Sequence, residues 1–429
     1  MQRIIVKNFG PLKDIDLEIK DYMVFLGPQA SGKSTLAKLI YFFREIEITL
    51  YTYLLKNFEN INDETIIKGL NEPINSRLSQ FFGDYTFTDN IIVKFYVGKN
   101  RLLKHITLNY DSISQLFVSD VDLSFFKTSL DKKLSSPELS NFKTIFGIDD
   151  LIQNKNLFPV IAGLMMDKFD VLKKLNTDYF IPSNRAFIAK NYSPASTDTL
   201  SKEFYDFVGE IKNKFKKDYL AQIGEKKFFG SKIKNESSIQ LCLKLIQSIL
   251  RGRFIYEKNE EKIILENGQQ INLRSAASGQ QESIWVMNII FYLLLENNDT
   301  KTIIEEPEAH LFPEAQKDLT YLISLLANQA GNQVIITTHS HYILGALNIL
   351  INAHRIGQTS PEEVEKIVPK ELWIDKNRLF AGFMENGTIK NIYDDEAEMI
   401  KIQQLNAVAG EINKDFDKLL DLEFANEKV

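Results

Sequence analysis

The sequence predicts an α/β fold whose centre is a mostly parallel β-sheet. Three apolar, β-prone runs, at residues 22–26, 302–304 and 334–336, are each followed by polar residues and then by a helical pattern. Strands that are buried on both faces of a parallel sheet have this continuous apolar character. Ligands bind outside the carboxyl ends of such strands, so the polar residues after each run are the candidate functional site.

Length and composition limit how the chain can be organised. Its 429 residues, 44% of them hydrophobic, suit two or three structural units or one elaborated α/β domain. The net charge of −6 excludes a globally basic coat for nucleic acid, although it allows a local basic patch. The single cysteine, Cys242, excludes a disulfide framework and a cysteine-based zinc site.

The N-terminus and the apolar runs predict a location. The first residues alternate like a strand and do not have the pattern of a signal peptide. The longest apolar run, at 284–295, contains Asn288 and is too short to cross a bilayer. We therefore expect a soluble, cytoplasmic protein with no membrane partner.

The run at 22–26 leads into a glycine-rich loop with the pattern G-x-x-x-x-G-K-[ST], followed by a helical pattern. Its glycines let backbone N–H groups face inward around a polyphosphate, and the helix adds the positive end of its dipole. Lys33 would reach the β- and γ-phosphates, and the Ser34 hydroxyl would bind Mg²⁺. The predicted nucleotide-binding residues are Gly27, Pro28, Gln29, Ala30, Ser31, Gly32, Lys33, Ser34 and Thr35.

The remaining sequence divides into a core and an insertion. We assign residues 1–44 and 176–429 to the core, which begins with an N-terminal antiparallel β-subdomain and ends with its C-terminal part at 346–429. Residues 45–175 are predicted to be an insertion of helices and one β-hairpin. The expected strands of this half are 3–7, 15–19, 23–26 and the hairpin 90–96 and 102–109. A second hairpin at 380–384 and 388–392 and a closing amphipathic helix at 396–422 are expected near the C-terminus.

Residues 198–250 are predicted to form a helical lobe, followed by a small antiparallel sheet between 254 and 273. The lobe contains lysines with acidic residues between them, which leaves two interpretations open. The cluster is either a solvated helix face or a patch for nucleic-acid phosphates or an acidic partner. These residues are Lys212, Lys214, Lys216, Lys217, Lys226, Lys227, Lys232 and Lys234.

The segment Ser278-Gly279-Gln280-Gln281 precedes a strongly apolar helical run. A serine and a glycine at a helix N-terminus can bind a second anion, but an ordinary serine N-cap has the same pattern. Both interpretations stay open on the sequence alone.

Glutamates follow the apolar run at 302–304. A cluster of carboxylates at the end of a buried strand is costly unless it meets a cation, although a charged loop is the simpler alternative. We expect Glu305 to hold Mg²⁺ and Glu306 to orient and deprotonate the attacking water. His339, after the next strand, is placed to contact a γ-phosphate through its ring N–H. Histidine-based metal binding is disfavoured, since His310 and His341 match no ligand spacing.

The order of these motifs resembles that of the ABC-type P-loop ATPases. Residues 27–35 resemble a Walker A loop, and 278–281 resemble a degenerate signature motif. Residues 303–306 resemble Walker B with its catalytic glutamate, and His339 resembles the switch histidine. Residues 5–11 are similar to the opening strands of the RecF and SMC-like ATPases.

A narrower resemblance is carried by residues 305–313 together with 337–340. These are similar to prokaryotic AAA family ATPases akin to the OLD nucleases and to ATPase subunits of the phage-defence systems PARIS, Septu and Gabija. The chain departs from the pattern at Glu305, where many relatives have Asp, and at Gln280, which replaces a glycine. Asn184 stands where a Q-loop residue is expected, and no segment resembles the Toprim nuclease domain of the OLD enzymes.

The resemblance implies an ATPase whose composite sites are shared between protomers of a homo-oligomer, at least an ATP-dependent dimer. We expect its turnover to be slow, because the extra methylene of Glu305 would shift Mg²⁺. Lys33, Glu306 and His339 would serve catalysis, and Ser278, Gly279 and Gln280 would complete the nucleotide site of a partner copy. The implied role is a sensor or scaffold in antiphage defence that controls a separate effector, such as a nuclease. The alternatives are a DNA-repair or chromosome-associated ATPase, a transporter subunit and a nucleotide-locked structural module.

Overall fold

The computed structural model describes most of the chain. The described residues are 2–56, 69–83, 85, 87, 90–97, 105–111, 116–121, 178–189, 199–215, 227–228, 231–232, 235–257, 260–401 and 414–419. Within this part of the chain, no helix is long and apolar enough to cross a membrane.

The centre of the molecule is a six-stranded sheet with the order β16-β15-β3-β14-β13-β7. All neighbouring strands are parallel except the edge strand β16, so the predicted mostly parallel sheet is confirmed. β14 lies between β3 and β13, which brings the ends of the three predicted apolar runs to one edge. The strands are β3 (Tyr22–Leu26), β7 (Asp178–Ile181), β13 (Lys301–Glu305), β14 (Gln333–Thr338), β15 (Leu379–Glu385) and β16 (Thr388–Asn391).

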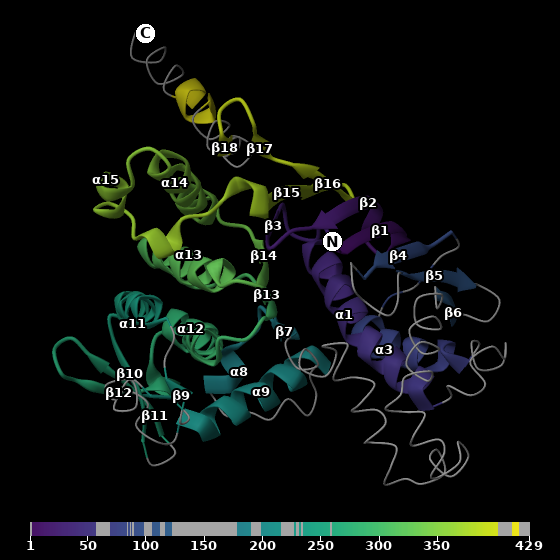
Figure 1. The fold of residues 1–429 in the computed structure, drawn as a ribbon, viewed down its shortest axis with the longest axis horizontal. Coiled ribbons are helices and arrows are strands. Elements are labelled where there is room, and N and C mark those ends of the chain that lie inside the picture. The colour runs from purple at the N-terminus through teal and green to yellow at the C-terminus, as the bar shows by residue number, and fades with distance from the viewer. Residues whose placement is uncertain are drawn as a thin grey trace, which may run out of the picture.

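Alternate residues of the sheet pack against different layers. Val24, Ile336 and Ile304 lie in one row across three strands and pack into the core formed with α11, α12, α13 and α14. The neighbouring row faces α1 and the N-terminal sheet on the other side (Figure 1). The helices are α1 (Lys33–Lys56), α11 (Glu236–Leu250), α12 (Ser278–Glu296), α13 (Pro313–Asn328) and α14 (His341–Gly357).

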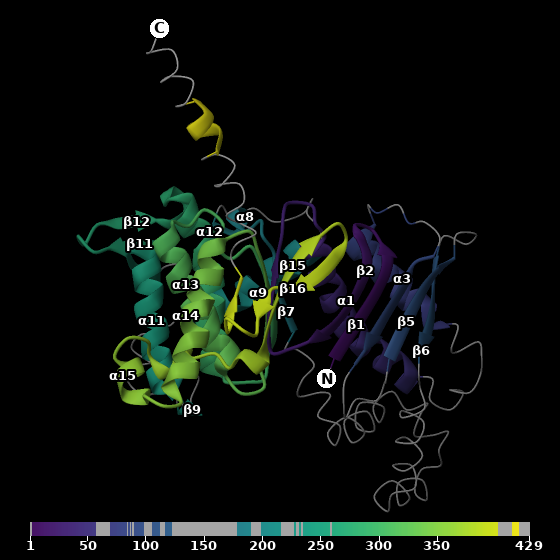
Figure 2. The same ribbon diagram turned by 90° about the horizontal axis from the view of Figure 1, so that it is seen from above.

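A second, antiparallel sheet has the order β2-β1-β4-β5-β6 and lies beside α1 and α3 (Figure 2). The predicted hairpin is confirmed as β4 and β5, but β4 also pairs with β1 and therefore extends the N-terminal sheet. The division at 45–175 stays a prediction, and residues 122–177 lie outside the described residues. The elements are β1 (Gln2–Phe9), β2 (Leu12–Ile19), β4 (Ile92–Tyr96), β5 (His105–Asp111), β6 (Leu116–Val121) and α3 (Asn71–Phe82).

The predicted helical lobe contains α9 (Thr199–Phe215) and α11. The short helix α8 (Ala186–Ala189) lies just before it in the chain. Within this lobe, β8 (Lys227–Phe228) and β9 (Ser231–Lys232) pair as a short antiparallel ladder, which the sequence analysis did not predict. The small sheet that follows is confirmed. It consists of β10 (Gly252–Glu257), β11 (Glu260–Leu265) and β12 (Gln270–Asn272), after which η3 (Leu273–Ser275) leads into α12.

Between α14 and the sheet, the chain forms α15 (Pro361–Glu365), η4 (Lys370–Leu372) and η5 (Lys376–Arg378). The predicted hairpin near 380–392 is confirmed as β15 and β16. The predicted closing helix is wrong at its start, where β17 (Tyr393–Asp394) pairs with β18 (Met399–Ile400). Asn348 on α14 holds β18 extended, because it exchanges two hydrogen bonds with the Ile400 backbone. Residues 414–419 are helical.

Candidate functional site

The glycine-rich loop joins β3 to α1 and requires its glycines. A Cβ atom at Gly27 would lie 2.2 Å from the Met384 carbonyl oxygen, and one at Gly32 would lie 2.6 Å from Leu12 Cδ2. Gly32 has a φ angle of +98°, which side chains rarely adopt. The loop therefore needs the two glycines of the motif to fit between β15 and the N-terminal sheet.

Lys33 begins α1 and turns its side chain back into the loop. Its Nζ donates to the Gly27 carbonyl at 2.9 Å and to the Pro28 carbonyl at 2.7 Å. Burial lowers the pKa of the Lys33 ammonium, and the charges of Glu306 and Glu308 oppose this shift. The ammonium group thus lies inside the curve of the loop, where the motif places the phosphates of a nucleotide.

Glu305 ends β13 and is only 4% exposed. Its Oε1 atom is buried without a hydrogen-bond partner, and the nearby Ser34 hydroxyl favours the charged form of the carboxylate. Burial raises the pKa of the Glu305 carboxyl, and the Ser34 hydroxyl and the charge of Lys38 oppose this shift. A buried, unpartnered carboxylate oxygen next to a hydroxyl suits Mg²⁺, which prefers oxygen ligands. Glu305 and Ser34 therefore fit the predicted metal site.

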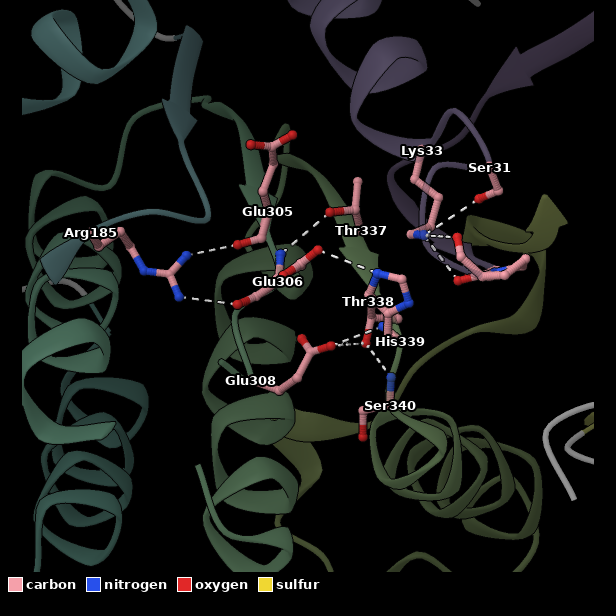
Figure 3. A network of polar contacts seen from close by, with 12 residues as sticks. Ser31, Lys33, Arg185, Glu305, Glu306, Glu308, Thr337, Thr338, His339 and Ser340 are labelled. Carbon is pink, nitrogen blue, oxygen red and sulfur yellow. Dashed lines mark hydrogen bonds and ion pairs between the residues drawn. The ribbon is translucent and has the colours of Figure 1, made fainter. Parts of the chain in front are cut away.

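Glu306 and His339 lie together between the ends of β13 and β14. His339 Nε2 is 3.3 Å from Glu306 Oε1, and both side chains are 38% exposed, so solvent reaches them (Figure 3). The Glu306 backbone has a φ angle of +41°, and its N–H donates to the Thr337 carbonyl at 2.9 Å. The structure thus brings together the predicted base and the predicted γ-phosphate contact.

Glu308 connects the two loops, a role that the sequence analysis did not find. Its Oε1 accepts hydrogen bonds from the Thr338 hydroxyl at 2.6 Å and from the His339 backbone N–H at 2.9 Å. The only signal in the sequence was that a third glutamate follows the predicted strand closely.

Arg185 is a second residue that the sequence analysis missed. It follows β7, is 1% exposed, and directs its guanidinium to backbone carbonyls of other elements, including those of Glu305 and Glu306 (Figure 3). Burial lowers the pKa of this guanidinium, although nearby glutamates oppose the shift. Asn184, the expected Q-loop position, is exposed. The available signal was a charged residue shortly after a buried strand, four positions beyond Ile181.

The structure gives the three signature residues different environments. The N-cap of α12 is Ala277, so the simple interpretation of Ser278 as an N-cap is wrong, and Ser278 is exposed. Gly279 is buried, and a Cβ there would lie 2.5 Å from the His310 carbonyl oxygen. Gln280 donates to the Leu250 carbonyl at 2.8 Å. Among the described residues, no hydrogen bond or ion pair joins these residues to the loop at 27–35.

Two lysines of the cluster form internal contacts. Lys212 pairs with Glu261 at 3.0 Å and lies over the Trp285 ring at 5.0 Å. Lys214 hydrogen-bonds to the Tyr292 hydroxyl and lies over that ring at 4.5 Å. These contacts favour a structural role at both positions, whereas Lys216, Lys217, Lys226 and Lys234 lie outside the described residues.

The sheet order and the glycine-rich loop at its edge define a P-loop ATPase head. A sequence model of the AAA ATPase domain matches residues 1–344, and the chain therefore belongs to this ATPase family. The family supports ATP as the nucleotide that the loop binds.

Solved structures with a similar arrangement include two SMC head domains and one transporter cassette. The SMC head domain from Thermotoga maritima is 10% identical, with coverage of 91% of this chain and 97% of that chain and a TM-score of 0.38. The Smc head from Pyrococcus furiosus with the C-terminal domain of ScpA is 13% identical, with coverage of 96% and 100% and a TM-score of 0.40. A dimeric bacterial ABC transporter cassette is 12% identical, with coverage of 91% and 97% and a TM-score of 0.33. A comparison with curated proteins found no match.

Proposed function

We propose that the protein is an ABC-type ATPase that hydrolyses ATP with Mg²⁺ and pairs with a second copy when ATP is bound. The observation that carries this proposal is the 3.3 Å contact between His339 and Glu306, at the sheet edge that also carries the Lys33 loop. A carboxylate and an imidazole beside a phosphate-binding loop are the groups that water activation and γ-phosphate contact require.

In this proposal, each residue has a defined task. Lys33 leaves the loop carbonyls and binds the β- and γ-phosphates, since a phosphate is a stronger acceptor for an ammonium than a neutral carbonyl is. Glu306 accepts the proton of the attacking water, and His339 orients the Glu306 carboxylate and contacts the γ-phosphate. Glu305 and Ser34 hold Mg²⁺, which when bound neutralises charge that develops on the phosphates.

The signature segment supports a shared site. Ser278 is the first residue of α12, a helix of 19 residues, and it is exposed. None of the described hydrogen bonds of residues 278–280 goes to the loop at 27–35. A helix N-terminus attracts anions, so a nucleotide held by a second copy is a suitable ligand. ATP would then hold two copies together, and hydrolysis would release them.

The cellular role in this proposal is a sensor or scaffold in antiphage defence that controls a separate effector, such as a nuclease. Its support is the resemblance of residues 305–313 and 337–340 to ATPases of defence systems. The internal pairing of Lys212 and Lys214 weighs against the alternative of a DNA-repair ATPase, since these ammonium groups already have partners.

Three variants test the ATPase proposal. Glu306→Gln keeps the size of the side chain but removes the base, so we expect turnover to fall by on the order of 10²-fold or more. The matched control is Glu314→Gln, because Glu314 is 71% exposed on α13 and should leave turnover unchanged. Ser278→Arg should block ATP-dependent dimerisation, measured by light scattering after size exclusion.

The outcomes separate the alternatives. Equal turnover in the native chain and in Glu306→Gln would refute the assignment of Glu306 and favour a nucleotide-locked module. A mass that does not change with ATP in Glu306→Gln would refute the shared site. Tight DNA binding that weakens with salt would favour the DNA-repair alternative over the defence role.

A further inference from the structure

Arg185 is a buried cation whose described hydrogen bonds all go to backbone carbonyls. Nε donates to the Glu282 carbonyl at 3.1 Å, and Nη1 donates to the Pro182 carbonyl at 2.8 Å. Nη1 also donates to the Glu305 carbonyl at 2.7 Å, and Nη2 donates to the Glu306 carbonyl at 3.0 Å. The guanidinium therefore links the segment after β7, helix α12 and the end of β13.

This set of acceptors requires arginine. A guanidinium presents five donors in a rigid planar fork, whereas a lysine ammonium is a compact charge that cannot span separated carbonyls. Burial of a charge is costly unless its donors are satisfied, so a structural position of this kind would more simply be filled by an apolar residue. The cost indicates that the link itself has a use.

The Glu306 backbone is held at both ends in a strained conformation. Its φ angle of +41° is in the left-handed region, which a residue with a side chain rarely adopts and which clusters at functional sites. The N–H of Glu306 donates to the Thr337 carbonyl at 2.9 Å, and its carbonyl accepts from Arg185. The direction of the Glu306 side chain toward His339 depends on this backbone conformation.

Helix α12 connects the other end of the link to the signature segment. Glu282, whose carbonyl accepts from Arg185 Nε, lies four residues after Ser278 and thus one turn along the same helix. A displacement of the α12 N-terminus therefore reaches the Glu282 carbonyl, the guanidinium and the Glu306 carbonyl through contacts of 3.1 Å or less.

We propose that Arg185 is a positioning residue that holds the Glu306 backbone for hydrolysis and couples it to the signature helix α12. This inference rests on the proposed ATPase function and assigns a regulatory link within that site. Engagement of Ser278 and Gly279 by the nucleotide of a second copy would set the position of Glu306 through Arg185. Nucleotide binding itself does not depend on the link, because Arg185 is on the far side of β13 from the loop at 27–35.

The main test compares Arg185→Lys with Arg44→Lys in the full chain. Arg44 is a matched control, because it is also buried, at 2% exposure, but it bonds to Gln2 and Gln333 away from the glutamates. We expect Arg185→Lys to lower kcat by on the order of 10–100-fold with an unchanged KM for ATP. Its ATP-dependent dimerisation should persist, and Arg44→Lys should change only the melting temperature.

A double variant tests whether Arg185 acts through Glu306. In a Glu306→Gln background, Arg185→Lys should cause no further loss of turnover, since the group that it positions has been removed. A kcat for Arg185→Lys equal to that of the native chain, or a loss of the same size in Arg44→Lys, would overturn the inference while leaving the ATPase proposal intact. Equal turnover of the native chain and Glu306→Gln would overturn both.

A second measurement remains informative if Arg185 variants do not fold. Hydrogen exchange of the native chain should show α12 and the segment around Glu306 gaining protection together when ATP is added. Protection of one segment without the other would overturn the coupling. This measurement does not depend on the rate of turnover.

Discussion

Glu308→Ala should disconnect the His339 loop from the Glu306 loop. The native carboxylate accepts from the Thr338 hydroxyl at 2.6 Å and from the His339 N–H at 2.9 Å. Alanine removes both acceptors without adding bulk, so these two donors lose their partner. His339, whose ring is 3.3 Å from Glu306 Oε1, should then lose its fixed position.

The size of the effect follows from these contacts. A hydrogen bond to a charged group contributes about 1.5–3 kcal/mol, but the His339 N–H is exposed and can bond to water instead. We therefore expect Glu308→Ala to lower the free energy of unfolding by about 2–4 kcal/mol. Glu308→Gln keeps an acceptor oxygen but loses the charge, so roughly half of this loss is expected.

The assay is steady-state ATP turnover together with thermal melting. Displacement of His339 should lower kcat by on the order of 10–100-fold in Glu308→Ala, with a smaller loss in Glu308→Gln. Glu314→Ala is the control, because its side chain is 71% exposed and should leave both quantities unchanged. A native kcat in Glu308→Ala would refute the role of Glu308 in placing His339.

Three further predictions concern other parts of the molecule. Burial raises the folded-state pKa of the Glu305 carboxyl above its ordinary value. The protonated carboxyl therefore stabilises the fold below that ordinary value, and this stabilisation is lost as pH rises through the raised pKa. Glu305→Gln should accordingly melt higher than the native nucleotide-free chain at pH 7, with a difference that vanishes near pH 4. Gly279→Ala should lose about 1–3 kcal/mol of stability, because its Cβ would meet the His310 carbonyl, whereas Gly209→Ala, with open space around it, should gain stability in a melting experiment. Lys212→Gln should lower the melting temperature without changing DNA affinity in a salt titration, and a large loss of DNA affinity would restore the phosphate-patch interpretation.

Local sequence patterns were sufficient to predict the glycine-rich loop and the main strands of the central sheet. Residues 27–35 are contiguous, so the glycines, Lys33 and Ser34 are recognisable without knowledge of any other segment. The apolar runs before Gly27, Glu305 and Thr337 predicted parallel neighbours, and the pairing of β3, β14 and β13 confirms this.

Local sequence patterns did not predict elements whose conformation depends on residues far away in the chain. The register of β4 against β1 joins residues about ninety positions apart, which no local periodicity specifies. The same applies to β18, whose extended conformation depends on hydrogen bonds with Asn348 on α14. The sequence near Ile400 has a helix-like pattern, but this tertiary contact holds the residues in an extended conformation instead.

The sequence by itself determined that the protein is an α/β P-loop ATPase with Lys33, Glu305, Glu306 and His339 at the carboxyl ends of its strands, because these residues occur in contiguous motifs whose local geometry is largely independent of context. Only the tertiary structure decided that Arg185 and Glu308 hold the motifs in place. Arg185 reaches Glu306 across 121 positions and Glu308 reaches Thr338 across 30, and hydrogen bonds of this kind form only after the sheet has aligned the strand ends.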